Sequence, residues 1–240
     1  MSSGAEFAKF HKAEDLALYE ASPDVLRKKL GEVVLDAVVG PYGSGKDAVI
    51  NFLVANFPHM FAPVIGDTNR EKRPGEINGQ VHHFRKESAM IRDLHRGRFV
   101  QVAPGSGGTF YATRPEQYPK DKIALKAIYA REVNNFRRLG FKRVDWLQIV
   151  PYSFESWLNW REANAMSPTD KVERDIEAVK SYSLALTNPD THFILNDDVE
   201  KAGMRIVRFA QGRRIPDETR AREVAALNLR AQKRWIKQNT

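Results

Sequence analysis

The clearest hydrophobic pattern in the chain is an apolar run, followed by a glycine-rich turn and then by a helical stretch. Residues 33–39 are nearly all aliphatic and mostly β-branched, as expected of a strand that is buried on both faces. Residues 47–57 continue with apolar positions at helical spacing. This part of the chain therefore predicts a strand, a tight turn and a helix.

Similar apolar runs alternate with helical stretches along most of the remaining sequence. Further strands are expected at residues 61–65, 98–103, 122–128, 144–150 and 192–195. Helices are expected at residues 87–96, 132–139, 153–162, 170–186 and 197–211. Such alternation predicts an α/β fold in three layers, with helices on both faces of a mainly parallel central sheet.

The two ends of the chain differ from this central region. Residues 5–30 show a helical pattern, and Ser22-Pro23-Asp24 is a good helix start. The last residues predict one basic helix. We therefore expect a helical extension at residues 1–31, a main domain at 32–212 and a basic C-terminal helix at 213–240.

Composition excludes several classes of protein. The 240-residue chain is 42% hydrophobic and 28% charged, which is ordinary for a globular protein. It has no apolar run near the roughly 20 residues needed to cross a bilayer, and its N-terminus lacks the pattern of a signal peptide. With no cysteine, disulfides and thiol chemistry are excluded. We expect a cytoplasmic protein with no membrane segment.

A net charge of +8 suggests an anionic partner, which charge alone does not identify. Nucleic acid, a membrane surface and a phosphorylated substrate all fit. In the basic C-terminal segment, Val224, Leu227, Ala231 and Trp235 share one side of the expected helix, which favours packing on its own domain or on a partner chain in a homo-oligomer. No nucleic-acid motif accompanies the segment, so nucleic acid is not the expected partner.

The glycine-rich turn fits the first seven positions of the phosphate-binding pattern G-x-x-x-x-G-K-[ST]. Glycines let the backbone turn tightly and point its N–H groups at phosphate oxygens, and the following helix adds its positive end. Lys46 would reach the β- and γ-phosphates of ATP. The alternative is an ordinary glycine-rich turn. The predicted ATP-binding residues here are Gly40, Pro41, Tyr42, Gly43, Ser44, Gly45, Lys46 and Asp47.

Asp47 stands where the pattern has a hydroxyl residue that binds Mg²⁺. A carboxylate beside a triphosphate is repelled unless a cation lies between them, and Mg²⁺ prefers oxygen ligands. One hypothesis is that Asp47 holds Mg²⁺, directly or through water. The alternative, which the sequence leaves equally open, is that Asp47 caps the helix.

A second informative segment begins near Arg70 and Arg73. Pro-Gly and Asn-Gly turns follow, so the two guanidinium groups are expected on a loop. Arginine suits phosphate because its planar fork donates two parallel hydrogen bonds. By itself this is only a basic loop, and most such loops are simply solvated.

The phosphate loop together with T-x-R-x-x-R-P-G-E-x-N-G-x-x-x-x-F resembles guanylate kinase over residues 33–212. The resemblance implies a nucleoside-monophosphate-kinase-like fold with acceptor-binding and lid insertions, which transfers phosphate from ATP with Mg²⁺. GMP is the best single guess for the acceptor. The acceptor's phosphate would be held by Arg70, Arg73, His82 and Tyr111, while Asn196 would lie near the donor nucleotide.

The chain departs from the family at several positions. The guanine-reading serine and glutamate fall on Gly66 and Gln101, which weakens the expectation of guanine specificity. The acidic pair expected near residues 125–128 is missing. The usual lid arginines are absent from their register, which leaves Arg161 and Arg174 as candidate catalytic lid residues.

Two alternatives follow from these departures. The sequence G-P-x-G-S-G-K-D and the missing acids resemble ribose 1,5-bisphosphate phosphokinase, whose arginine after that strand could match Arg131. Its acceptor is a sugar phosphate. Guanylate kinase-like domains also occur as non-catalytic modules that bind phosphorylated peptides. The intact Gly45-Lys46 pair argues against such a module, since it has no use for an ATP cradle.

Overall fold

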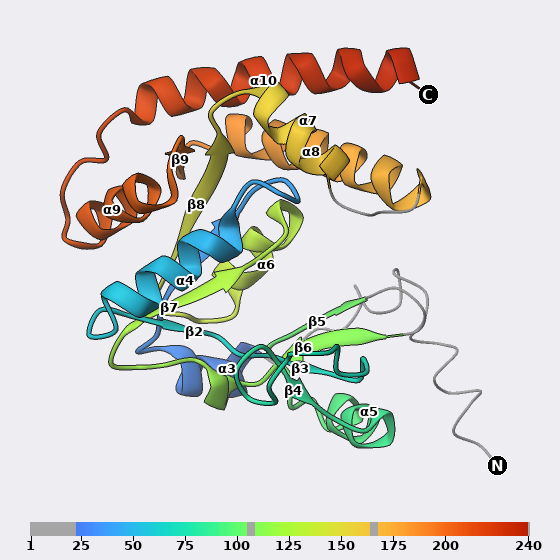
Figure 1. Ribbon diagram of the computed structural model, residues 1–240. Coiled ribbons are helices and arrows are strands. Elements are labelled where there is room, and N and C mark those ends of the chain that lie inside the picture. Colours follow the sequence, from blue (N-terminus) through green and yellow to red (C-terminus); the bar gives the residue numbers. More distant parts are fainter. Residues whose placement is uncertain (1–22, 105–108, 164–167, 240) are drawn as a thin grey trace. The chain divides into compact units, whose positions relative to one another are not determined.

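The computed structural model describes residues 23–104, 109–163 and 168–239 (Figure 1). Its contacts divide the chain into two compact units, which are considered separately below. The smaller unit comprises Met1–Val33, Val64–Ala124 and Arg137–Lys142. The larger unit comprises Val34–Pro63, Leu125–Phe136 and Arg143–Thr240.

The larger unit is built around a five-stranded sheet. Its strand order is β2 (Phe61–Pro63), β7 (Ile123–Ala127), β1 (Val34–Val39), β8 (Arg143–Pro151) and β9 (Thr191–Asn196). Strand β1 pairs in parallel with β8, and β8 pairs in parallel with β9. The aliphatic residues of β1 are fully buried, as its unbroken apolar run predicts. The expected α/β fold with a parallel central sheet is confirmed.

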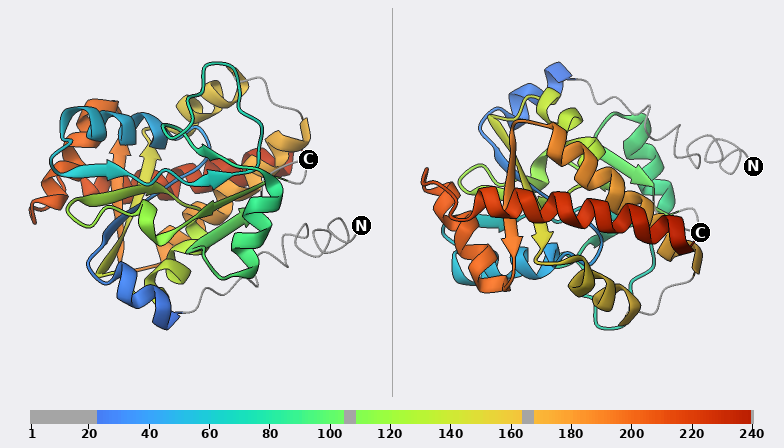
Figure 2. Two further views of the ribbon diagram at one scale, coloured as in Figure 1. Left: turned by 90° about the horizontal axis from the view of Figure 1, so that it is seen from below. Right: turned by 90° about the horizontal axis from the view of Figure 1, so that it is seen from above.

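Helices flank this sheet. They are α4 (Lys46–Asn56), α6 (Val133–Arg138), α7 (Phe154–Ala163), α8 (Pro168–Thr187), α9 (Val199–Ala210) and α10 (Glu218–Asn239), with a short 3₁₀ turn at Ala130–Glu132. Helix α4 packs on α9, where a side chain at Gly203 would collide with Phe52. Helix α10 packs along α8 and β9 (Figure 2). The expected basic helix is therefore present, and it packs on its own unit.

The smaller unit contains a second sheet that the sequence patterns did not predict. Its strand order is β4 (His83–Phe84), β3 (Asp67–Thr68), β6 (Phe110–Thr113) and β5 (Gln101–Pro104). The unit also has helices α3 (Pro23–Leu30) and α5 (Glu87–His95), and a 3₁₀ turn at Pro115–Gln117. Strand β6 runs antiparallel to both β3 and β5.

Alternation along these strands separates a core face from a polar face. The core of the smaller unit comprises Met90, Leu94, Phe99, Val102, Phe110 and Ala112. Val102 pairs with Ala112 on this face, whereas Ala103 pairs with Tyr111 on the other. Gln101 and Tyr111 therefore lie on the face of the sheet opposite the core that α5 covers.

The expected N-terminal helix and the expected absence of a membrane segment can be compared only with the described residues. Of the expected N-terminal helical pattern, residues 5–22 lie outside the described part, and α3 accounts for the remainder. Among the described residues, no helix combines the length and hydrophobicity that a membrane span requires.

Candidate active site

The phosphate loop of the larger unit has the backbone that its glycines predict. Gly43 and Gly45 adopt left-handed conformations, with φ of 80° and 89°. A Cβ at Gly45 would lie 2.3 Å from the side-chain amide nitrogen of Asn196. That nitrogen donates a hydrogen bond of 2.7 Å to the carbonyl of Ser44. Asn196, at the carboxyl end of β9, therefore fastens the loop from a distant part of the sequence.

Lys46 lies folded across the loop. Its ammonium group donates to the carbonyl oxygens of Gly40 and Pro41 at 2.7 and 2.8 Å. Burial lowers the pKa of Lys46, and the nearby carboxylates of Glu177 and Asp47 oppose that shift. The hydroxyl of Ser44 is buried and has no hydrogen-bond partner among the described residues. Phosphate oxygens could replace the two carbonyl oxygens as partners of the Lys46 ammonium group, and the Ser44 hydroxyl is free to bond. Both features fit a binding site for the phosphates of a nucleotide.

Asp47 lies exposed in the first turn of α4. The N-cap position of α4 is Gly45, which makes no side-chain capping bond. Within the described residues, no group of three histidine or acidic side chains could hold a metal ion. Mg²⁺ commonly keeps several waters and binds one or two carboxylates together with substrate phosphates. A lone exposed carboxylate beside the phosphate loop fits that mode of binding.

Helix α8 brings a carboxylate and a guanidinium group to the same loop. Glu177 accepts a hydrogen bond from the backbone N–H of Tyr42, and burial raises its pKa against the opposing charges of Lys46 and Arg174. The Arg174 guanidinium lies 4.7 Å from the centre of the Tyr42 ring. It also donates a long bond of 3.5 Å to the hydroxyl of Tyr129.

Arg174 was a candidate from the sequence, and the structure places it beside the phosphate loop. Glu177 was missed because no motif marks it. It is an acidic residue near the loop in a chain that lacks the family's acidic strand pair.

Helix α7 packs against the other side of the loop through two tryptophans. The indole N–H of Trp157 donates to the carbonyl of Tyr42 at 2.8 Å. The rings of Tyr42 and Trp160 meet edge to face, with centroids 5.2 Å apart. A Cβ at Gly43 would lie 2.0 Å from a Trp160 ring carbon, so this position requires glycine.

Arg161 has a structural position. Its guanidinium binds both carboxylate oxygens of Asp175 at 2.8 and 2.6 Å, and it also contacts Glu162. Arg161 and Asp175 are only 6% and 5% exposed. The pair joins α7 to α8. In this geometry the Arg161 guanidinium is occupied by Asp175. The catalytic role expected for Arg161 remains a prediction.

In the smaller unit, Glu76 organises the arginine loop. Its carboxylate accepts two bonds from the Arg70 guanidinium, at 2.8 and 3.0 Å, and a third from the backbone N–H of Arg73 at 2.7 Å. The hydrogen bonds from Arg70 and Arg73 lower the pKa of Glu76 to about 2. The glutamate of the R-x-x-R-P-G-E pattern therefore fixes the loop, because it binds the side chain of the first arginine and the backbone of the second.

Three of the predicted acceptor residues lie together. Arg70 is hydrogen-bonded to Tyr111, and the rings of His82 and Tyr111 lie 5.3 Å apart. The Arg70 guanidinium also lies 5.4 Å from the centre of the Phe84 ring. The side chain of Arg73 is exposed on the same loop. Arg70, His82 and Tyr111 form one cationic and aromatic cluster.

The sequence patterns did not identify a buried aspartate in β3, just before the arginine loop. Asp67 is fully buried and accepts hydrogen bonds from Arg85, Arg114 and Gln117, at 2.7, 3.2 and 2.6 Å. Arg85 also pairs with Asp93 at 2.8 Å. This network fixes β3 and therefore the start of the arginine loop.

Gly66 explains part of the departure at the guanine-reading positions. A Cβ at Gly66 would lie 2.8 Å from the carbonyl oxygen of Ala112 on β6. The backbone of β6 therefore occupies the space of a side chain at residue 66. Gln101 lies on the polar face of the same sheet, and it is neutral where the family has a carboxylate.

The strand, phosphate loop and helix of the larger unit define a P-loop nucleotide-binding protein of the α/β class. The chain belongs to the guanylate kinase family, because the family model named Guanylate kinase matches residues 33–209. It is 30% identical over 179 residues to the guanylate kinase of Rubrobacter xylanophilus, covering 73% of this chain and 92% of that one. It is 28% identical over 172 residues to the guanylate kinase of a Nostoc species, covering 69% and 83%.

The fold agrees with this membership. The crystal structure of guanylate kinase from Anaplasma phagocytophilum matches with a TM-score of 0.54 and 21% sequence identity, covering 75% of this chain and 85% of that one. The resemblance seen in the phosphate loop and the arginine loop is confirmed.

Proposed function

We propose that the protein is an ATP-dependent kinase that transfers the γ-phosphoryl group to a nucleoside monophosphate, with GMP as the first candidate. The observation that carries this proposal is the formed phosphate loop, with left-handed Gly43 and Gly45, Lys46 folded over it and an unpartnered Ser44 hydroxyl. Membership of the guanylate kinase family supports the same reaction.

On the donor side, the loop N–H groups and Lys46 would bind the β- and γ-phosphates of ATP. Asp47 would hold Mg²⁺, directly or through water, and the ion would neutralise negative charge that develops on the phosphates. Arg174 would add positive charge beside the loop. Catalysis would rest on positioning and charge stabilisation, with no covalent intermediate on the protein.

On the acceptor side, Arg70, His82 and Tyr111 supply hydrogen-bond donors for one phosphate group, with Arg73 nearby on the loop. Arg70 is held by Glu76, so its guanidinium is ordered before a ligand arrives. Preordered donors reduce the entropy lost on binding.

A sugar phosphate such as ribose 1,5-bisphosphate is the second candidate acceptor. The observation that favours it is the weakened set of base-reading residues: the space for a side chain at Gly66 is closed by β6, and Gln101 is neutral. The phosphate cluster needs no base to bind its ligand. The chemistry would be the same, with a different acceptor pocket.

The test is ADP production from ATP and Mg²⁺ with GMP, dGMP, AMP, UMP, CMP or ribose 1,5-bisphosphate as acceptor. Lys46→Ala is the negative control and Arg70→Ala the acceptor-side variant. Turnover of one acceptor, lost in Lys46→Ala and weakened through KM in Arg70→Ala, is expected. No turnover with any acceptor, together with no ATP binding, would refute the kinase and favour a non-catalytic binding module.

A further inference from the structure

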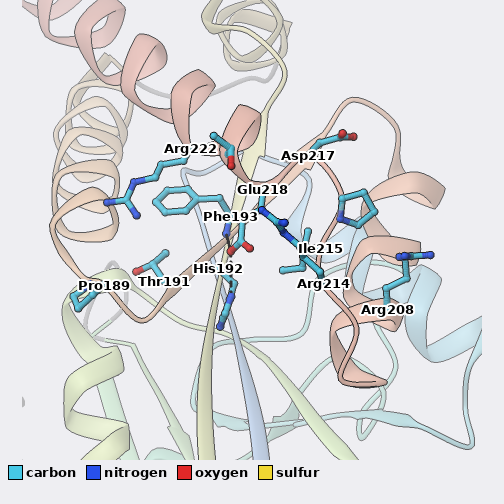
Figure 3. A pocket seen from close by; sticks show the side chains of 12 residues that line it. Pro189, Thr191, His192, Phe193, Arg208, Arg214, Ile215, Asp217, Glu218 and Arg222 are labelled. Carbon is cyan, nitrogen blue, oxygen red and sulfur yellow. Dashed lines mark hydrogen bonds and ion pairs between the residues drawn. The ribbon is translucent and has the colours of Figure 1, made fainter.

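A second cavity lies at the amino end of β9, where α9 is joined to α10 (Figure 3). Its volume is about 680 Å³, within the range of about 300–1,000 Å³ that is typical of small-molecule sites. Thr191, His192, Arg208, Arg214, Glu218 and Arg222 contribute to its lining. Figure 3 shows His192 and Glu218 between the side chains of Arg222 and Arg208.

This cavity is separate from the phosphate loop. Asn196 binds that loop from the carboxyl end of β9, whereas Thr191 begins the strand. Five residue steps at about 3.3 Å place the two about 17 Å apart. Part of the cavity wall also lies beyond residue 209, where the match to the guanylate kinase family ends.

The acidic residues in the wall are already paired within the protein. The Asp217 carboxylate accepts a bond from Arg205 at 3.2 Å. The Glu218 carboxylate accepts from the backbone N–H of Phe193 at 3.3 Å, and lies 3.1 Å from Nδ1 of His192. Both carboxylates keep their negative charge, and Arg205 is shared between Asp217 and Asp197, so the acids in the wall offset part of the positive charge that faces the cavity.

The arginines have no such neutralising partners. Arg208 and Arg214 make no ion pair with any described residue. Arg222 donates to the carbonyl of Leu186 at 2.9 Å and lies over the ring of Phe193, contacts that leave its charge uncompensated. The wall therefore carries three guanidinium groups against two carboxylates, and this excess of positive charge favours an anion.

Two further features point to a bound anion. Thr191 is only 4% exposed, and its hydroxyl has no hydrogen-bond partner among the described residues, although buried hydroxyls are nearly always bonded. The first turn of the 22-residue helix α10 also forms part of the wall. Its free N–H groups and positive dipole end favour a negative charge.

We propose that this cavity is a second binding site, which takes the phosphate group of a small phosphorylated organic molecule. Arg208, Arg214 and Arg222 would bind the phosphate, together with the start of α10. The Thr191 hydroxyl would bond to the ligand, and the cavity's apolar wall at Ile215 and Phe193 would contact its carbon skeleton. An inorganic phosphate would fill only part of the volume.

The test follows backbone amide resonances of the full chain during titration with ribose 5-phosphate at constant ionic strength. Saturable shifts are expected at Thr191, His192 and Thr219. Arg214→Gln should weaken the affinity read at these amides by about tenfold or more, since hydrogen bonds to charged groups contribute most to such sites. Because the readout is local to the cavity, it is independent of the kinase reaction.

Arg230→Gln is the matched control, because Arg230 is exposed like Arg214 but lies further along, in α10, and does not line the cavity. Ribose without phosphate and added sodium chloride control for the sugar and for the salt. The proposal is overturned if the three amides respond no more to ribose 5-phosphate than to sodium chloride. It is equally overturned if Arg230→Gln weakens binding as much as Arg214→Gln does.

Discussion

Replacing Asp175 with alanine should destabilise the protein far more than an ordinary surface charge change would. The substitution leaves the Arg161 guanidinium buried between α7 and α8, with only the half-exposed Glu162 in contact. Breaking a buried pair costs about 3–5 kcal/mol, because one charge loses its partner without regaining water. Since Glu162 remains, we expect a value near the lower limit, about 3 kcal/mol.

A double replacement should be much milder. Burial raises the pKa of the Asp175 carboxyl even though Arg161 opposes the shift, so the cost of desolvation exceeds the gain from pairing. Arg161→Met combined with Asp175→Leu removes both charges and keeps the packing volume. The free energy of unfolding of this double variant should lie within about 1 kcal/mol of the wild type.

Urea unfolding measures both effects through the transition midpoint, provided the slope of the free energy with urea is unchanged. Lys171→Met is the matched control. Lys171 binds Glu162 at 2.6 Å on the same two helices, but this pair is exposed and should contribute less than about 1 kcal/mol. If Arg161→Met abolished kinase turnover while leaving the midpoint unchanged, the structural role assigned to Arg161 would be refuted, and the lid role implied by the family resemblance would stand.

Three further predictions concern single positions. Gly45→Ala forces a left-handed alanine into contact with Asn196 and should abolish ATP binding measured by calorimetry, whereas Gly212→Ala (φ 72°, in open space) should carry only the backbone cost of about 1–2 kcal/mol. Because the pKa of Glu76 is lowered to about 2, its contribution to stability is complete above about pH 4.3 and disappears as the pH falls toward 2. Thermal unfolding of Glu76→Gln should therefore differ from the wild type at pH 6 but converge with it near pH 2. Burial lowers the pKa of Lys126 to about 8, so wild-type stability should rise between pH values of about 8 and 10.4. Lys126→Met should lack this rise in pH-dependent urea unfolding, and an unchanged rise would contradict the assignment.

The central sheet and the phosphate loop could be predicted because their signals are local. The β-branched run at residues 33–39 is recognisable from its own composition, and the glycines that follow it have conformations that other residues rarely adopt. Most helices of the larger unit lie within two residues of their expected ends, since their apolar positions recur at helical spacing.

The second sheet could not be predicted in the same way. Strands β3 and β4 have two residues each and flank the polar arginine loop, so they show no alternation that a pattern could detect. Their pairing depends on tertiary contacts, above all on the buried Asp67 and the arginines around it. Glu177 was missed for a related reason: it reaches the phosphate loop from α8, and nothing in its local sequence marks it.

The contact between Gly66 and β6 constrains how the serine that the family resemblance implies could be introduced at residue 66. A serine at residue 66 places its Cβ 2.8 Å from the carbonyl of Ala112, so the substitution is unfavourable until β6 has moved. Gln101→Glu changes the charge while keeping nearly the same side-chain size, but alone it supplies only half of the base-reading pair. A serine at residue 66 therefore requires a second change, one that shifts the backbone of β6. The distance between Gly66 and β6 thus decides which side chains residue 66 can carry, and no single substitution at residue 66 changes that distance.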